Sequence, residues 1–149
     1  MEIKPLEEYD ACALYSMLIF LEAENQQIEG MVGVGSVVRN RVLDPGKDWF
    51  GDTWKEVMLK EWQFSCFNSD NHERILLAQT LWADRRSVKN KIFEQCRMLA
   101  CNLMDGRIVD NTKGANHYFN MWTPWPKWSV GQIPTTVIRD HAFFYIRHE

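Results

Sequence analysis

One stretch, LIFLEAENQQIEGMVG at residues 18–33, sets the organisation of this chain. A run of apolar residues ends there in the carboxylates of Glu22 and Glu24, a short polar patch follows, and a second, glycine-spaced apolar run begins. A carboxylate at the end of an apolar helix loses part of its hydration, which raises its pKa toward the value that a general acid needs at neutral pH. We therefore expect Glu22 to carry the chemistry and the rest of the chain to build a substrate groove around it.

Length and composition favour one globular domain. The 149 residues suffice for a core without disulfide or metal staples, so we expect residues 1–149 to form a single domain. The net charge of −3 offers no basic surface for nucleic acid, and we expect no such partner. The four cysteines include no C-x-x-C pair, which indicates free thiols and synthesis in a reducing cytoplasm. They are Cys12, Cys66, Cys96 and Cys101.

The amino-terminal residues predict a protein that is made in the host cytoplasm without a signal peptide. Residues 1–8 are acidic and lack the apolar segment that directs secretion. The apolar run at residues 11–21 is too short to span a membrane. A substrate outside the cytoplasm must then be reached by another route, such as lysis.

Apolar periodicity predicts a mainly helical chain. Helices are expected at about residues 6–23, 29–43, 54–60, 72–86 and 88–104, with Asn71 as the cap of the fourth. In the second helix the apolar residues Met31, Val34, Val38 and Val42 share one face, whereas Arg39 and Arg41 point elsewhere. Gly30, Gly33 and Gly35 weaken that helix, and we expect the close approach of another backbone to explain them.

Local signals also define caps and strands. Thr53 and Glu56 predict a capping box at the start of the third helix. Residues 136–139 and 142–146 alternate as an antiparallel strand pair joined through Asp140 and His141, and the aromatic segment near residues 117–120 is another strand candidate. The predicted fold class is therefore α+β, mainly helical with a small antiparallel sheet near the carboxy terminus.

Several motifs, in order, resemble those of one known family. Residues 22–30 (EAENQQIEG) and 37–42 (VVRNRV) are similar to the pattern E-A-R-G-E-x-x-E-G followed by a valine-rich helix and N-R-V. Gln63-Phe64-Ser65 is similar to Q-F-S, and residues 110–118 (DNTKGANHY) are similar to D-x-T-x-G-A-x-x-Y/F. This order resembles the catalytic domain of SleB/CwlJ-type cell-wall hydrolases, which are spore-cortex-lytic enzymes and related phage lysins. The resemblance covers about residues 8–146.

The resemblance implies a lysozyme-related fold, peptidoglycan glycan strands as substrate, and a lytic transglycosylase or muramidase-type reaction with one catalytic glutamate at Glu22. Three positions depart from the family pattern. Glu24 replaces an arginine, Asn25 a glycine, and Gln26 the second glutamate. A mechanism that requires a carboxylate at position 26 is therefore excluded for this chain.

Alternatives remain open for each candidate residue. Glu22 could be a solvated helix end. Glu29 could hold a hydroxyl or water across the groove, or it could stabilise the first turn of the second helix through the helix dipole. Short polar side chains on loops suit sugar hydroxyls and acetamido groups, although each is also common in ordinary loops. The candidates of this kind are Gln63, Ser65, Thr112, His117 and Tyr118.

The aromatic and metal-ligating residues give weaker signals. Trp122, Trp125 and Trp128 could line a saccharide groove or pack as core or lid. The histidines and cysteines do not stand at metal-ligand spacing, so we expect no metal and no cofactor.

The leading hypothesis is a monomeric phage lysin, a lytic transglycosylase that cleaves between N-acetylmuramic acid and N-acetylglucosamine. It would act on the cell wall or in the periplasm after release or as a virion component. The alternatives are a muramidase or amidase on the same scaffold, and a catalytically inactive wall-binding protein that keeps the groove.

Overall fold

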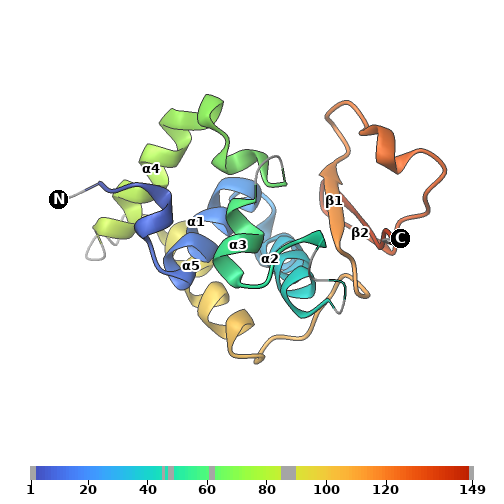
Figure 1. The fold of residues 1–149 in the computed structure, drawn as a ribbon, viewed down its shortest axis with the longest axis horizontal. Helices are drawn as coiled ribbons and strands as arrows, with labels where there is room; N and C mark the ends of the chain where they lie inside the picture. The colour runs from blue at the N-terminus through green and yellow to red at the C-terminus, as the bar shows by residue number, and fades with distance from the viewer. Residues whose placement is uncertain (1–2, 45, 47–48, 61–62, 85–89, 148–149) are drawn as a thin grey trace.

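The computed structural model describes residues 3–44, 46, 49–60, 63–84 and 90–147. Its helices are α1 (Ala11–Ala23), α2 (Gln27–Leu43), α3 (Trp54–Leu59), α4 (His72–Ala83) and α5 (Lys91–Met104), with short 3-10 turns at η1 (Leu6–Glu8), η3 (Ser65–Phe67), η4 (Ser69–Asn71) and η5 (Lys127–Ser129). Its strands are β1 (His117–Asn120), β2 (Thr136–Ile138) and β3 (His141–Phe144). The helices gather around α1, and the sheet stands beyond α2 (Figure 1). The predicted α+β class, with its sheet near the carboxy terminus, is confirmed.

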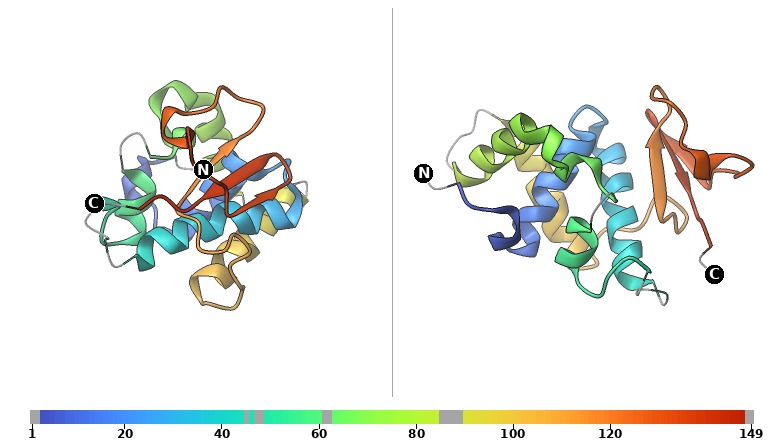
Figure 2. Two further views of the ribbon diagram at one scale, coloured as in Figure 1. Left: turned by 90° about the vertical axis from the view of Figure 1, so that its right-hand side faces the viewer. Right: turned by 45° about the horizontal axis from the view of Figure 1, so that its top comes forward.

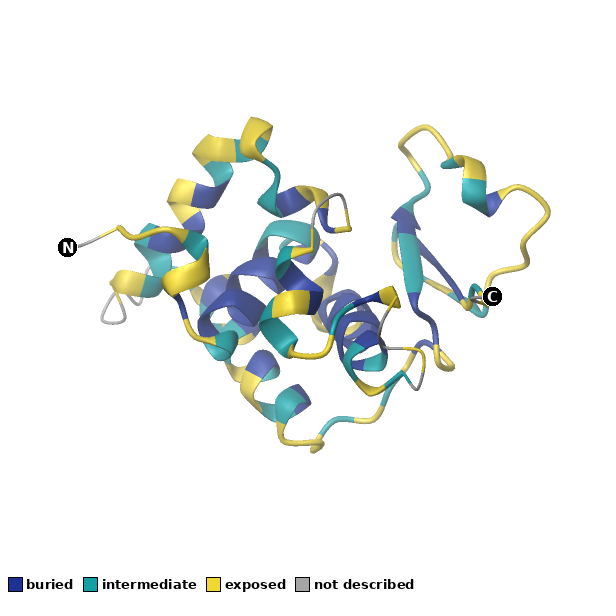
Figure 3. Ribbon diagram, in the orientation of Figure 1, coloured by how far each residue is buried: buried dark blue, intermediate teal, exposed yellow. Residues whose placement is uncertain are grey.

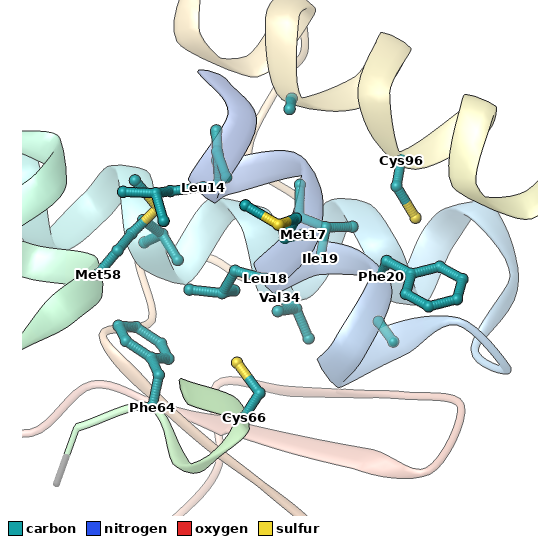
Figure 4. Close-up of a cluster of buried hydrophobic side chains, with 14 of the residues drawn as sticks. Leu14, Met17, Leu18, Ile19, Phe20, Val34, Met58, Phe64, Cys66 and Cys96 are labelled. Atoms are coloured by element: carbon teal, nitrogen blue, oxygen red, sulfur yellow. The ribbon is translucent and has the colours of Figure 1, made fainter. Parts of the chain in front are cut away.

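Helix α1 lies at the centre of the helical layer. Its sequence is apolar on all sides, and α2, α3, α4 and α5 all pack against it, so that most of the helix is buried (Figure 3). Side chains from α1 meet Met58 of α3, Phe64 and Cys66 of the following segment, and Cys96 of α5 in one cluster (Figure 4). The carboxy-terminal turn of α1, which carries Glu22, is therefore fixed by packing.

The beginning of α1 differs from the prediction. One helix was expected from residue 6, but Leu6–Glu8 form a separate 3-10 turn and Tyr9 is extended. Asp10 then caps α1, because its Oδ1 accepts a hydrogen bond from the backbone N of Ala13 at 2.8 Å. Such a cap satisfies an amide that would otherwise lack a partner in the first turn.

The other helix boundaries agree with the sequence to within a few residues. Helix α2 begins at Gln27 instead of Glu29, and α3 ends at Leu59. Thr53 caps α3 as predicted, although the Glu56 carboxylate accepts from the amide of Asp52 at 3.4 Å and not from that of Thr53. The predicted end of the fourth helix at Arg86 and the predicted start of the fifth at Val88 lie outside the described residues.

The sheet has the strand order β1-β3-β2, and both pairs are antiparallel (Figure 2). The predicted pairing of the last two strands is confirmed, but the turn consists of Arg139 and Asp140, because His141 already pairs with Ile138 in the sheet. Arg139, the first residue of this two-residue turn, has a positive φ of 54°, a conformation that residues other than glycine adopt infrequently. The aromatic strand candidate is β1.

A side-chain amide joins the helical layer to the sheet. Gln26, in the α1–α2 turn, is buried, and its Nε2 donates to Asp140 Oδ2 at 2.9 Å. Its Oε1 accepts from the backbone N of Asp140, also at 2.9 Å. The two hydrogen bonds hold the β2–β3 turn against the end of α1, directly behind the segment that carries Glu22.

The glycines of α2 make room for side chains and not, as predicted, for another backbone. A Cβ added to Gly33 would lie 2.7 Å from Cζ of Phe143, and one added to Gly35 would lie 2.5 Å from Cδ1 of Leu103. Phe143 comes from β3 and Leu103 from α5, so α2 accepts the sheet on one side and the helical core on the other.

We expect Gly33→Ala to lower the free energy of unfolding by about 1–2 kcal/mol, because the buried Phe143 ring must move to admit the new methyl group. Helix propensity alone favours alanine by about 1 kcal/mol, so the two effects have opposite signs. Urea unfolding of the wild type and the variant measures the difference. An unchanged or higher stability would contradict the close packing of the sheet on α2.

Candidate active site

A cleft of about 470 Å³ opens between the helical layer and the sheet. Residues from α1, α2, the segment around η3, strands β1 and β3, and the loop after β1 line it. The lining residues are Glu22, Arg41, Gln63, Ser65, Tyr118, Phe119, Asn120, Thr123, Pro124, Pro126, Trp128 and His141. Its walls are thus assembled from segments that lie far apart in the sequence.

Glu22 lies at the floor of this cleft, in the last turn of α1, and is only partly exposed. Burial raises the pKa of its carboxyl group. Hydrogen bonds from the Tyr118 hydroxyl and from the thiol and backbone of Cys66 act in the opposite direction, because they stabilise the carboxylate, but burial is the larger effect. Glu22 can therefore hold a proton at a higher pH than an exposed glutamate.

Tyr118 and Cys66 are held as protonated donors around this carboxyl group. Burial, followed by the charge of Glu22, raises the pKa of both side chains well above their ordinary values. At neutral pH both therefore keep their protons and donate hydrogen bonds to Glu22. The carboxyl group is oriented from two sides, by β1 and by η3.

Arg41 also lines the cleft, although its sequence pattern did not predict a functional role. Arg39 and Arg41 lie off the valine face as predicted, yet both are buried. Arg41 lies against Phe50 and Phe64, with its guanidinium carbon 4.7 and 4.8 Å from the two ring centroids. Burial lowers its pKa to about 10, so it remains a cation at neutral pH.

Two hydrogen bonds of Arg41 organise one wall of the cleft. Its Nε donates to the carbonyl oxygen of Asn116 at 2.8 Å, which fixes the approach to β1. Its Nη1 donates to Oε1 of Gln63 at 3.2 Å. The NH₂ group of the same amide takes no part in this hydrogen bond, because it is a donor like Nη1. The two arginines at the end of a mainly apolar segment of α2 were the sequence signal that could have identified this role.

Three of the predicted supporting residues, Gln63, Ser65 and Tyr118, line the cleft together with Glu22. Thr112 does not, because it is buried in the preceding loop, where its Oγ1 donates to Asp110 at 2.6 Å. His117 also lies outside the lining residues, and its ring packs 4.9 Å from that of Trp128.

Glu29 lies outside the cleft lining as well. It is exposed in the first turn of α2, and its Oε1 is 3.8 Å from Nη1 of Arg139. Its backbone carbonyl accepts from Asn111 at 3.0 Å. A supporting role for Glu29 stays a prediction, whereas its position in the first helical turn and its ion pair are structural features.

His141 and Asn120 also line the cleft, although the sequence analysis did not select them for it. His141 is buried, its ring meets that of Tyr118 edge-on at 5.2 Å, and its Nδ1 has no hydrogen-bond partner among the described residues. Burial lowers its pKa, which favours the neutral imidazole. Its position directly after the β2–β3 turn carried no sequence signal of a functional residue.

The three tryptophans separate into two groups. Trp128 lines the cleft and packs edge-on against Phe144 at 5.3 Å. Trp122 and Trp125 are largely exposed and lie outside the lining residues. Trp122 is held by Asp140, whose Oδ1 accepts from its Nε1 at 3.0 Å. Of the three, Trp128 is thus positioned to contact a ligand in the cleft.

The described residues contain neither a candidate metal site nor a helix that could span a membrane. The part of the chain that the structure describes contains no group of three or more His, Cys, Asp or Glu side chains placed to hold a metal ion. None of the described helices combines the length and the apolar character that crossing a bilayer requires.

Two solved structures are similar to this chain in fold. The catalytic domain of SleB from Bacillus cereus aligns with a TM-score of 0.64 and 20% identity, over 90% of this chain and 88% of that chain. The catalytic domain of the germination-specific lytic transglycosylase SleB from Bacillus anthracis aligns with a TM-score of 0.67 and 21% identity, over 95% and 99%. At these identities the likeness shows the fold. No curated protein sequence matches the chain.

The family model described as Cell Wall Hydrolase matches residues 25–144. This region begins just after Glu22, so it contains the other cleft residues but not Glu22 itself. Because the match spans most of the chain, the protein belongs to the cell-wall hydrolase family and is a cell-wall hydrolytic enzyme, as its resemblance to the SleB/CwlJ-type enzymes predicted.

Proposed function

We propose that residues 1–149 act as one peptidoglycan-cleaving unit, a lytic transglycosylase that uses Glu22 as its single acid and base. One observation carries this proposal. Glu22 is the only carboxylate among the described residues that line the cleft, and burial raises its pKa. The name of the similar SleB structure, a germination-specific lytic transglycosylase, supports the same reaction.

In the first step, the protonated Glu22 donates its proton to the glycosidic oxygen between N-acetylmuramic acid and N-acetylglucosamine. The bond between that oxygen and the anomeric carbon breaks as positive charge develops on the sugar ring. A raised pKa suits this step, because the acid must still hold its proton at the pH of the reaction.

In the second step, the Glu22 carboxylate accepts the proton of the C6 hydroxyl of the same muramic acid. The hydroxyl oxygen attacks the anomeric carbon and closes a 1,6-anhydro ring, and Glu22 regains its proton. Hydrogen bonds from Tyr118 and Cys66 stabilise the carboxylate between the two steps and hold it in place.

The intramolecular attack explains how one carboxylate can suffice. Ordinary glycoside hydrolases place a second carboxylate about 5–10 Å from the acid, to act as nucleophile or to activate water. Here the remaining polar groups of the cleft are neutral side chains and the Arg41 cation. The amides of Gln63 and Asn120 and the hydroxyl of Ser65 suit acetamido and hydroxyl groups of the glycan, and Trp128 offers an aromatic surface for a sugar ring.

We expect Glu22→Gln to lower the rate of peptidoglycan cleavage at least about 100-fold, because the amide can neither donate nor accept the transferred proton. The measurement is the loss of turbidity of permeabilised bacterial cells. The matched control is Glu24→Gln, two residues further along the chain, which neutralises a carboxylate that pairs with Arg74 outside the cleft lining and should keep nearly full activity. A fully active Glu22→Gln enzyme would refute the mechanism.

Glu22→Gln should not destabilise the fold at neutral pH. Burial raises the pKa of Glu22, so an unfolded chain loses this proton at a lower pH than the folded one. The contribution of Glu22 to stability is therefore fully present below the ordinary glutamate pKa and is lost as pH rises through the raised one. Glu22→Gln should weaken this decline in the free energy of unfolding, which urea titrations across the pH range measure. A decline as steep as that of the wild type would contradict the burial of the charge.

Tyr118→Phe removes a hydrogen bond that lowers the pKa of Glu22. The pKa should rise further, and the acid should stay protonated to a higher pH. We expect the alkaline limb of the pH–activity profile to move to higher pH, with a lower maximal rate because the carboxyl group is held less firmly. A shift of this limb to lower pH would exclude the proposed contact.

Mass spectrometry of digested sacculi distinguishes the possible reactions. The transglycosylase produces anhydromuropeptides. Reducing muramic acid ends would instead identify a muramidase, and freed stem peptides would identify an amidase. Binding to sacculi without any released product would identify an inactive wall-binding protein.

The biological setting that we propose is a phage lysin that reaches the wall after release or from the virion. The compact fold and the resemblance to SleB/CwlJ-type enzymes, which include phage lysins, support this setting. Addition of the purified protein to intact and to permeabilised cells tests whether it needs such a route. Lysis of intact cells from outside would favour a virion component, and lysis of permeabilised cells alone would favour release from within.

A further inference from the structure

Two cysteines from distant parts of the sequence meet at the surface of the helical layer. Cys12 lies in the first turn of α1 and Cys101 in the last turns of α5, 89 positions further along the chain. Their sulfur atoms are 3.2 Å apart. Cys101 is exposed and Cys12 is partly exposed, whereas Cys66 and Cys96 are buried.

The packing of the two helices fixes this approach. Cys12 meets Cys101 at one end of the helix pair, and Phe20 meets Phe93 at the other, with ring centroids 5.3 Å apart. Helices α1 and α5 therefore run antiparallel along their length, and the two thiols stay in register as long as the helical core is intact. A bond of about 2.05 Å between the sulfur atoms requires a movement of only about 1 Å.

We propose that Cys12 and Cys101 form a redox-sensitive pair that closes into a disulfide when the protein meets an oxidising thiol–disulfide environment. The expectation of four free thiols then describes the reduced protein alone. The disulfide would tie the start of α1 to the end of α5 and close a long loop of chain that includes α2, α3 and α4.

The reaction is ordinary thiol–disulfide exchange with a small disulfide such as oxidised glutathione. Cys101 is the more exposed thiol and meets the oxidant first. Its thiolate attacks one sulfur of the small disulfide, a mixed disulfide forms, and one thiolate of the oxidant leaves. Cys12 then loses its proton to water and attacks the sulfur of Cys101, which releases the second thiolate. Both electrons pass from the protein thiols to the oxidant.

The environment of Cys12 fits the role of the second thiol. Burial raises its pKa to about 12, and the neighbouring Cys101 thiol contributes to this rise. Cys12 is therefore slow to react while both thiols are free. Conversion of Cys101 to a mixed disulfide removes that contribution and places an electrophilic sulfur next to Cys12.

The disulfide would lie away from the cleft. Glu22 follows Cys12 by ten residues in α1, or about 15 Å along the helix axis. Neither cysteine is among the residues that line the cleft. We therefore expect closure of the disulfide to change the thermal stability of the protein and to leave the initial cleavage rate within about twofold.

The test compares reduced protein with protein incubated with oxidised glutathione. We expect the oxidised protein to lose one pair of hydrogen atoms in mass, and a digest under non-reducing conditions to contain the Cys12 and Cys101 peptides joined. Closing so long a loop should raise Tm by about 10 °C, and dithiothreitol should reverse this rise.

Three variants make the test specific. Cys12→Ser and Cys101→Ser should abolish both the joined peptide and the gain in Tm, whereas Cys96→Ala, which removes a buried thiol from the same helix, should preserve both. A lasting glutathione adduct on Cys101, or a dimer linked through Cys101, without the joined peptides would overturn the proposal. None of these measurements depends on enzymatic activity, so the outcome is independent of the proposed reaction.

Discussion

The burial of α1 on all sides is the constraint on which the rest of the structure depends. A helix that is apolar around its whole circumference can be satisfied only at the centre of a layer, and four other helices supply the cover. Its polar carboxy-terminal turn must then emerge where that cover ends. The cleft forms at this point, and Glu22 occupies its floor. The position of the catalytic candidate and the stability of the core therefore have the same physical origin.

The burial that stabilises the core carries an energetic cost at Glu22. A carboxyl group is retained at a site where burial disfavours its ionised form. Hydrogen bonds from Tyr118 and Cys66 reduce this penalty without removing it, so the pKa of Glu22 stays raised. Arg41 acts on the surroundings by fixing Gln63 and the entry to β1. Contacts with the rings of Phe50 and Phe64 stabilise this cation, which has no carboxylate partner among the described residues.

The sequence was sufficient for the features that depend on local patterns. Apolar periodicity predicted the helices, and alternation predicted the strands, because both patterns follow from backbone geometry. The family resemblance predicted Gln63, Ser65 and Tyr118, which the fold brings together with Glu22. The wrong prediction for the glycines of α2 arose because their neighbours are set by tertiary contacts. The partner of Gly33 is the ring of Phe143, and no local pattern identifies a side chain from a strand more than one hundred residues away.

The same limit explains which cleft residues were missed. A helical period assigns Arg41 to a face of α2, but only the folded chain shows that this face is covered by Phe50 and Phe64. Cys66 and His141 resemble ordinary core and turn residues in the sequence, and their roles arise from what packs against them. Thr112 and His117 belong to the same motif as Tyr118, but in the folded chain Thr112 stabilises the loop and His117 packs against Trp128.

The hydrogen bonds of the Gln26 amide limit which chimeras between this chain and its relatives can fold correctly. Toward Asp140 the side chain must donate one hydrogen bond with its nitrogen and accept another with its oxygen. A glutamate, which stands at this position in the family pattern, would bring two ionised carboxylates face to face and could not donate unless it took up a proton. Positions 26 and 140 therefore form a matched pair, and a chimera that takes its helical layer from one relative and its sheet from another must transfer both residues together.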